Sequence, residues 1–368
     1  MKINCDTQAL SAAINSVLLA VSSKSNLPSL EGILLRAQHG RLYLTGYDLE
    51  LGISTSLEAQ VEEEGEVVLS ARLFADMIKR MPAQRVSLSC DEKNLTEVTG
   101  GAVEYTILGI PARDFPELPT INDGTTLSLP QSQLKSMIGQ TLFAIAVSDS
   151  KPVHTGSLFD IEGGTATLVS VDGYRLALRR EQVNTPQTIS FIVPGKTLSD
   201  LMRLLEDRDD EVDIQVSAKH IIFSIGECSV VSRLLEGEFL DYKAAIPPQS
   251  STTVEIDTRA FIDSIERTSL LISDRLKSPL RVTFDGGMIR MSCSTAIGKA
   301  SDQLACKMEG EKVEMGFNNR YLLDALKNAD TDQVRLELGG PLSPMKVLPK
   351  EGDGFLFLVL PVRLKSEG

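Results

Sequence analysis

The residue types that carry most enzyme chemistry are sparse in this chain and do not cluster. Its three histidines, His39, His154 and His220, stand far apart, and none has the spacing of a metal site or a nucleophilic triad. No Gly-rich phosphate loop follows a strand pattern, and the acidic runs at 62–64 and 207–210 are typical of solvated loops. We therefore expect no enzyme activity, no cofactor and no metal. A hydrolase with an unrecognised site is the alternative from the enzyme class.

The cysteines and the apolar segments indicate a reduced, non-membrane environment. No Cys-x-x-Cys pair occurs, which favours free thiols over a disulfide framework or a zinc site. No window approaches the roughly 18 apolar residues of a membrane helix, and the N-terminus does not look like a signal peptide. We expect a cytoplasmic protein without a membrane partner. The five cysteines are Cys5, Cys90, Cys228, Cys293 and Cys306.

The charge of the chain argues against a conventional nucleic-acid-binding protein. The 368 residues carry a formal net charge of −13, whereas tight phosphate binding depends on a dominant basic surface. A role with nucleic acid must then depend on where the charges lie, or on something other than affinity.

A pattern of basic residue, aspartate and basic residue occurs three times. In each copy the aspartate follows the first basic residue by four positions and precedes the second by three, and successive copies lie 124 residues apart. The copies are Arg72-Asp76-Lys79, Lys196-Asp200-Arg203 and Arg320-Asp324-Lys327.

Other features recur at nearly the same offset, as expected of an internal repeat. Strand-like alternation at 40–44 has counterparts at 164–168 and 287–291, and the first two of these strands end at Asp48 and Asp172. The chain is also too long for one hydrophobic core. We predict an α+β protein of three tandem similar domains, 1–125, 126–249 and 250–368, each with two helices packed on antiparallel sheets.

The helices are expected to be less acidic than the rest of the chain. In the first predicted helix, residues 6–22, Leu10 to Val21 form an apolar stripe, and the opposite side carries Ser11 and Asn15. Six helical windows, 6–22, 69–82, 130–147, 193–206, 257–273 and 316–329, together carry a charge of about +2, which leaves about −15 for the remainder. This segregation favours helices that face a polyanion, although ordinary solvated helix faces are an alternative.

The ordered set of local motifs resembles the bacterial sliding clamp family, the beta subunits of DNA polymerase III. The resemblance runs the full length of the chain and ends at residues 360–364, Leu-Pro-Val-Arg-Leu. The motifs are Leu-Thr-Gly-Tyr-Asp-Leu-Glu at 44–50, Asp-Phe-Pro at 114–116, Val-Asp-Gly-Tyr-Arg-Leu-Ala at 171–177, Ile-Val-Pro-Gly-Lys at 192–196 and Gly-Phe-Asn at 316–318.

The resemblance implies a homodimeric ring whose helices line a hole around double-stranded DNA. A closed ring holds DNA topologically, so weak contacts to phosphate are sufficient and the acidic composition is explained. The implied function is a processivity factor that tethers the replicative polymerase. Matching positions predict DNA contacts at Lys24, Arg72, Lys196 and Arg203, and the helix-face argument adds Arg80, Lys135, Arg320 and Lys327.

The resemblance also implies a hydrophobic pocket that takes short peptides from partners: the polymerase alpha subunit, the clamp loader, and other replication and repair proteins. The chain departs from well-known members at Lys151, Leu240, Ala244 and Ala245, which affects peptide preference. The matching pocket positions are His154, Val171, Gly173, Tyr174, Arg175, Leu176, Leu240, Asn318, Tyr321, Leu342, Pro344, Leu358, Leu360, Pro361, Val362 and Arg363.

The dimer joint is expected where an edge strand of one protomer continues the sheet of the next. Family positions match Tyr105 and Ile107 in the first domain and Leu271 and Ile272 in the third. The alternative from a different functional class is a structural or adaptor ring with no DNA in its hole.

Overall fold

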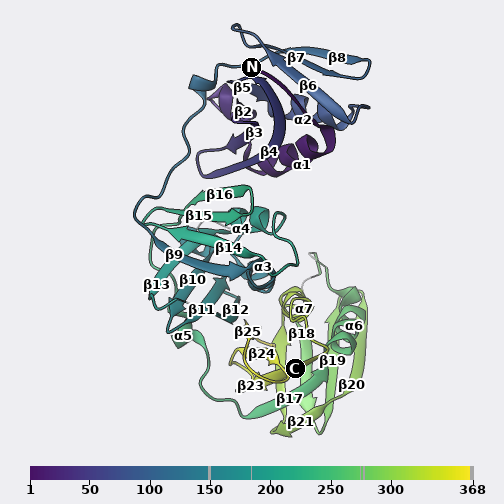
Figure 1. Ribbon diagram of the computed structural model, residues 1–368. Helices are drawn as coiled ribbons and strands as arrows, with labels where there is room; N and C mark the ends of the chain where they lie inside the picture. Colours follow the sequence, from purple (N-terminus) through teal and green to yellow (C-terminus); the bar gives the residue numbers. More distant parts are fainter. Residues whose placement is uncertain (148–150, 184, 274, 277, 365–368) are drawn as a thin grey trace. The chain divides into compact units, whose positions relative to one another are not determined.

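The computed structural model describes residues 1–147, 151–183, 185–273, 275–276 and 278–364 (Figure 1). The contacts within the chain divide it into two compact units. The first unit joins Met1–Ser132 to Asp200–Leu234, and the second joins Gln133–Ser199 to the residues from Leu235 onward. Since this division follows packing rather than repetition, the boundaries of the three predicted domains stay a prediction.

In the described residues of the first unit, the strands form one antiparallel sheet. Its main path runs β8-β7-β6-β1-β4-β16-β15-β14-β9, and β2, β3 and β5 branch from it through β4. The strands are β1 Lys2–Asp6, β2 Gly32–Gln38, β3 Arg41–Tyr47, β4 Leu51–Glu63, β5 Gly65–Ser70, β6 Arg85–Cys90, β7 Leu95–Gly100, β8 Val103–Leu108, β9 Thr125–Pro130, β14 Glu211–Val216, β15 His220–Ile225 and β16 Cys228–Arg233.

Helix α1 of the first unit packs its apolar side against β4 and the neighbouring α2. Leu10, Ile14 and Val17 are buried, as the stripe predicted. The prediction that the helix continues to residue 22 is wrong: it ends at Val17, a 3₁₀ turn follows, and Val21 has extended backbone. The helices are α1 Thr7–Val17, η1 Leu18–Ala20, η2 Pro28–Glu31, α2 Ala71–Lys79 and η3 Ala112–Asp114.

The described residues of the second unit form two antiparallel sheets. The larger has the order β13-β10-β11-β12-β25-β24-β23-β17-β21 and the smaller β20-β19-β18-β22. The strands are β10 Gly156–Glu162, β11 Thr165–Val171, β12 Arg175–Gln182, β13 Ile189–Pro194, β17 Thr252–Asp257, β18 Leu280–Asp285, β19 Met288–Thr295, β20 Gly298–Ala305, β21 Lys307–Gly310, β22 Val313–Phe317, β23 Gln333–Leu338, β24 Met345–Pro349 and β25 Phe355–Val359.

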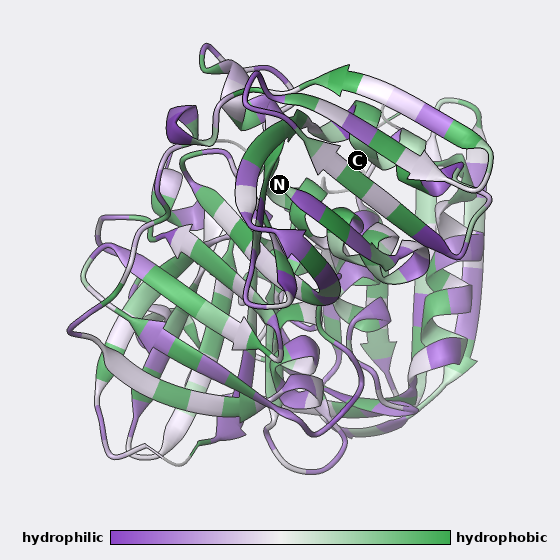
Figure 2. Cartoon of the chain, turned by 45° about the horizontal axis from the view of Figure 1, so that its top comes forward, coloured by the Kyte–Doolittle hydropathy of each residue, from purple (hydrophilic) through white to green (hydrophobic). Residues whose placement is uncertain are grey.

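Helices α6 and α7 of the second unit contribute to a core that contains Phe261, Phe284, Phe317 and Phe357. Hydrophobic and hydrophilic residues alternate along many strands (Figure 2), because successive side chains point to opposite faces of a sheet. The helices are α3 Gln131–Gly139, η4 Leu142–Ala144, η5 Pro152–Thr155, α4 Gly195–Leu201, α5 Tyr242–Ala245, α6 Thr258–Thr268, η6 Ser269–Leu271 and α7 Asn319–Lys327; the division between the units falls within α3 and α4.

The repeated positions adopt the same local structure. Asp48 follows β3 and accepts the backbone N–H groups of Glu50 and Leu51 at 3.0 and 2.7 Å. Asp172 follows β11 and accepts those of Tyr174 and Arg175 at 2.9 and 3.1 Å. The next residue has positive φ in both turns, 76° at Leu49 and 90° at Gly173. The sequence repeat is therefore also a structural repeat.

The aspartates that precede the first helices of the first and third repeats act as N-caps. Asp6 accepts the N–H of Ala9 at 2.8 Å, and Asp257 accepts that of Ala260 at 2.7 Å. We expect Asp257→Ala to lower the free energy of unfolding by about 1 kcal/mol, because a first-turn donor loses its acceptor. The urea midpoint at constant m value measures this. Asp257→Asn is the control and should stay near wild type; an unchanged midpoint in Asp257→Ala would contradict the cap.

Candidate functional site

The repeated basic–Asp–basic pattern lies in the second helix of each repeat. Arg320, Asp324 and Lys327 are spaced by one and two turns of α7 and so share one side of it. Arg72, Asp76 and Lys79 lie in the same way on α2. In the middle copy α4 ends at Leu201, so Arg203 lies beyond the helix, and the predicted window to 206 is too long. The structure therefore places the pattern on helices in two copies and partly in the third.

The eight predicted DNA contacts are mostly surface residues. All are exposed except Lys135 of α3, which is half-buried, and Lys24 follows η1 rather than lying on a helix. Some are ion-paired: Arg80 with Asp76 at 3.0 Å, and Lys327 with Glu266 at 2.6 Å. Their assembly into one phosphate-facing surface stays a prediction.

The predicted peptide pocket lies entirely in the second unit, where β12 and β25 pair with Leu176 opposite Leu358. Both leucines and Val171 are buried in one apolar cluster. Beyond β25, Leu360 donates its backbone N–H to the carbonyl of Tyr174 at 3.0 Å, while its side chain remains 38% exposed. This region therefore offers an apolar floor beside a partly exposed leucine that is fixed through its backbone.

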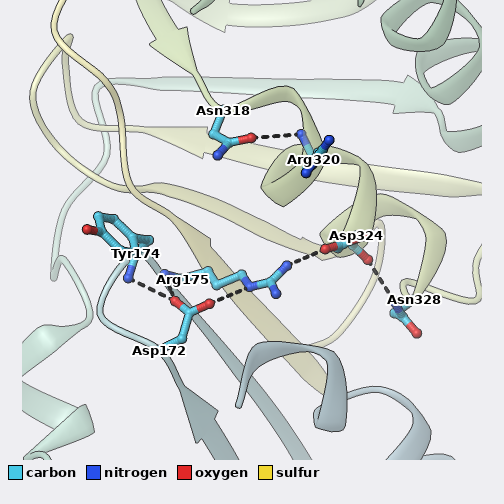
Figure 3. A network of polar contacts seen from close by, with 7 residues as sticks. All are labelled: Asp172, Tyr174, Arg175, Asn318, Arg320, Asp324 and Asn328. Atoms are coloured by element: carbon cyan, nitrogen blue, oxygen red, sulfur yellow. Dashed lines mark hydrogen bonds and ion pairs between the residues drawn. The ribbon is translucent and has the colours of Figure 1, made fainter. Parts of the chain in front are cut away.

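Arg175 is the centre of the polar part of this region (Figure 3). Its Nε donates to Asp172 at 2.9 Å, and its Nη1 donates to Asp324 of α7. The Arg175 side chain is 11% exposed and that of Asp324 is 44% exposed. A guanidinium fork between two carboxylates is strongly oriented, so Arg175 ties the β11–β12 turn to α7.

Two tyrosines extend this network toward the surface. The Arg175 guanidinium lies 4.7 Å from the centre of the Tyr321 ring, and Tyr321 stacks on Tyr174 at 5.8 Å. Burial, with the negative charge of Asp172, raises the pKa of Tyr321, so its hydroxyl stays neutral at pH 7. Since Tyr174 is 61% exposed, the stack offers an aromatic surface to a ligand.

The segment after β25 also forms part of a cavity. Val362 donates its N–H to Gly316 at 2.8 Å, and a Cβ at Gly316 would lie 2.5 Å from the Val362 carbonyl oxygen, so glycine allows this close approach. The adjoining cavity has a volume of about 370 Å³. It is lined by Ile272, Ser273, Ser278, Pro279, Phe317, Asn318, Asn319, Arg320 and Val362.

The other predicted pocket residues lie at several places in the second unit. His154 of η5 is buried and packs edge-on against Phe239 at 5.4 Å; burial, with the charge of Lys151, lowers its pKa. Leu240 and Leu342 lie on exposed loops, and Leu342 is 69% exposed. The remaining positions are Gly173 in the β11–β12 turn, half-buried Pro344 before β24, half-buried Pro361 and exposed Arg363.

Three residues of the network were not predicted as site residues: Asp172, Asp324 and Phe143, whose ring lies 5.5 Å from the Arg175 guanidinium. The sequence did contain a signal for Asp324, since it is the aspartate of the repeated pattern. It contained no signal for its pairing with Arg175, 149 positions away.

The residues predicted for the dimer joint lie at or beside sheet edges. Tyr105 and Ile107 are half-buried on β8, which ends the sheet of the first unit. Leu271 of η6 packs near Gly298 of β20, an edge strand of the smaller sheet of the second unit, and Ile272 packs against the core. The nearby side chains of Leu270 and Ile297 are 82% and 68% exposed, which apolar periodicity did not predict.

Within the described residues, no group of His, Cys, Asp and Glu is arranged to hold a metal ion. All five cysteines are free, and burial raises the pKa of Cys5 to about 12 and of Cys228 to about 11, so both are protonated thiols at neutral pH. None of the described helices is long and apolar enough to cross a membrane.

Three family models match the chain in order: the N-terminal domain of the DNA polymerase III beta subunit at residues 1–119, the central domain at 128–241 and the C-terminal domain at 243–363. The beta sliding clamp of Halalkalibacterium halodurans is 32% identical over 365 residues, which cover 95% of this chain and 96% of the relative. The chain therefore belongs to the family of DNA polymerase III beta subunits.

Solved structures agree with this assignment. The DNA polymerase sliding clamp from Bacillus subtilis has 29% identity and a TM-score of 0.96, with 99% of this chain and 100% of the other covered. The Pseudomonas aeruginosa sliding clamp bound to griselimycin has 30% identity, a TM-score of 0.95 and the same coverage. The predicted α+β fold of three tandem clamp domains is confirmed. The function is that of a sliding clamp, a processivity factor for DNA polymerase.

Proposed function

We propose that two copies of this chain close into a ring around double-stranded DNA, with domains 1–125, 126–249 and 250–368 in each copy. The observation that carries this proposal is the repeated pair of exposed basic residues, which lies on the second helix in the first and third repeats and spans the end of α4 in the second, in a chain of net charge −13. Few phosphate contacts give weak, salt-sensitive attraction. In a closed ring weak attraction is sufficient, because topology prevents dissociation while the ring slides.

The region around Arg175 is proposed to bind short peptides of the polymerase alpha subunit, the clamp loader and other replication and repair proteins. An apolar floor, a stacked aromatic pair and a fixed arginine are the features of a small peptide anchor. The complex of the Pseudomonas aeruginosa clamp with griselimycin supports a ligand site in this family. Tethering then acts by effective concentration, since a released polymerase remains beside the primer end.

Closure is proposed to pair β8 of one copy with β20 of the other. Both strands end their sheets in the described part of the chain, and an exposed edge is a template for another strand. Each copy offers one edge of each kind, so a head-to-tail joint closes with two copies. Leu270 and Ile297 beside β20 supply apolar surface for this contact. No catalytic role is proposed, and the expected location is the cytoplasm.

Retention on DNA of defined topology tests the proposal. After loading by a clamp loader, the protein should remain on nicked circular DNA through gel filtration. It should dissociate within minutes of linearisation, because a sliding ring leaves linear DNA at its ends. The control is the same circle cut before loading. Equal retention on circular and linear DNA, or none on either, would favour the alternative of a structural ring without DNA.

A further inference from the structure

The aspartate of the repeated pattern has a different partner in each copy. Asp76 is 60% exposed and pairs with Arg80 at 3.0 Å, and Asp200 lies 3.9 Å from Arg203. Arg80 and Arg203 are both neighbours in sequence of the aspartates that they contact, and Asp200 has a further interaction. Asp324 instead pairs with Arg175, which belongs to the predicted peptide pocket. In the first repeat the position that corresponds to Arg175 is Leu51, which is buried and has no charge.

Asp324 therefore belongs to two proposed sites at once. Its place between Arg320 and Lys327 puts it on the side of α7 that is proposed to face DNA, and its side chain is 44% exposed. Its carboxylate also holds Arg175, which lies under the ring of Tyr321 and through it supports the stack with Tyr174.

We propose that Asp324 couples DNA contact to ligand binding in the pocket. A phosphate held by Arg320 and Lys327 repels the Asp324 carboxylate toward Arg175. Arg175 and Asp324 are already in hydrogen-bond contact, so the phosphate acts by keeping the pair closed for a larger fraction of the time. A pair that opens less often keeps the guanidinium and the two tyrosine rings in place, so binding a ligand costs less conformational entropy. Because coupling is reciprocal, a ligand in the pocket also strengthens the phosphate contact.

With this coupling, the pocket has a higher ligand affinity in the DNA-bound clamp than in the free clamp, whereas a rigid pocket has the same affinity in both. Partners bind more tightly to a clamp that already surrounds DNA than to a free clamp. Asp324 is then a positioning residue, since it acts on the ligand through Arg175. This inference rests on the proposed function, because it requires both that α7 faces DNA and that the Arg175 region binds ligands.

The test measures griselimycin affinity for free clamp and for clamp loaded on nicked circular DNA. For wild type we expect affinity to rise about fivefold on DNA, within the usual range of coupling between sites. Asp324→Asn should lose the rise and bind griselimycin about fivefold more weakly without DNA. Asp76→Asn is the matched control: it removes an equivalent acid from α2 and should keep the wild-type rise. Asp324→Glu retains the charge and should retain the rise.

Two results would overturn the coupling while leaving the proposed function intact: no rise in wild type, or a wild-type rise in Asp324→Asn. Retention of Asp324→Asn on circular DNA shows that this variant is folded and closed. Should it fail to fold, Asp324→Glu decides, since loss of the rise there would contradict a role for the carboxylate. Failure of wild type to bind griselimycin or to stay on circles would refute the proposed function itself.

Discussion

Replacing Leu360 and Arg363 together by alanine is expected to weaken ligand binding in the pocket by about 30-fold or more while the ring stays assembled. The Leu360 side chain is 38% exposed beside the buried pair Leu176 and Leu358, so it can cover an inserted apolar group. Its backbone bond to Tyr174 does not need the side chain, and the segment should keep its path. Central anchors of this kind are worth roughly 2–4 kcal/mol, which corresponds to a loss of about 30- to 1,000-fold in griselimycin affinity.

Calorimetric titration with griselimycin measures this loss, and sedimentation velocity checks that two chains remain together. Leu95→Ala is the matched control, because Leu95 is similarly exposed at 42% but lies on β7 of the first unit. Unchanged griselimycin affinity in the double variant would show that residues 360–363 are not part of the pocket.

The second large effect is expected at the dimer joint. Ile107 lies on edge strand β8 among the half-buried residues of an alternating pattern, while its neighbour Thr106 is exposed on the opposite face. Ile107→Asp would place a charge against apolar surface in the joint, at a cost of about 3 kcal/mol or more. We expect the dissociation constant of the dimer to rise at least 100-fold.

Sedimentation equilibrium across a range of concentrations gives that constant, and the variant should also be lost from nicked circular DNA. Thr106→Asp introduces the same charge on the same strand but on its outer face, and should remain a dimer. If both variants dissociate to the same extent, a charge on either face of β8 weakens the dimer. The half-buried face that carries Ile107 would then not be the specific contact of the joint. If neither dissociates, the joint lies elsewhere.

Repetition made the fold predictable. Once the pattern around Asp76, Asp200 and Asp324 showed three copies, a local signal in one copy was supported by its counterparts in the others. The apolar stripe of α1 and the turns at Asp48 and Asp172 appear as expected. Helix ends were less predictable. Val21 continues the apolar spacing but has extended backbone after a 3₁₀ turn, and Arg203 lies past the end of α4. Periodicity reports which face is buried, whereas the last turn depends on tertiary packing.

The pocket was less predictable from the sequence than the fold. Family resemblance supplied Arg175 and Tyr321, and the structure brings them together. The carboxylates that fix Arg175 were not predicted: Asp172 looked like a strand-ending turn residue, which it also is, and Asp324 looked like one charge of a helix face. The local sequence of each aspartate is compatible both with its local function and with an ion pair to Arg175. For Asp172 the second function is a side-chain contact with Arg175 three positions later, and for Asp324 it is a side-chain contact with the same arginine 149 positions away.

The presence of Leu51 where a later repeat has Arg175 has a consequence for stoichiometry. The three repeats have similar helices, but a guanidinium stands at this position in the second repeat and an aliphatic side chain in the first. An assembly of two chains would then display two sites built on this guanidinium, and none of that kind on its two first repeats. If these are the sites of ligand binding, the assembly would bind two ligands at a time, for example a polymerase and one competitor. A third protein would bind only after one of the two had dissociated.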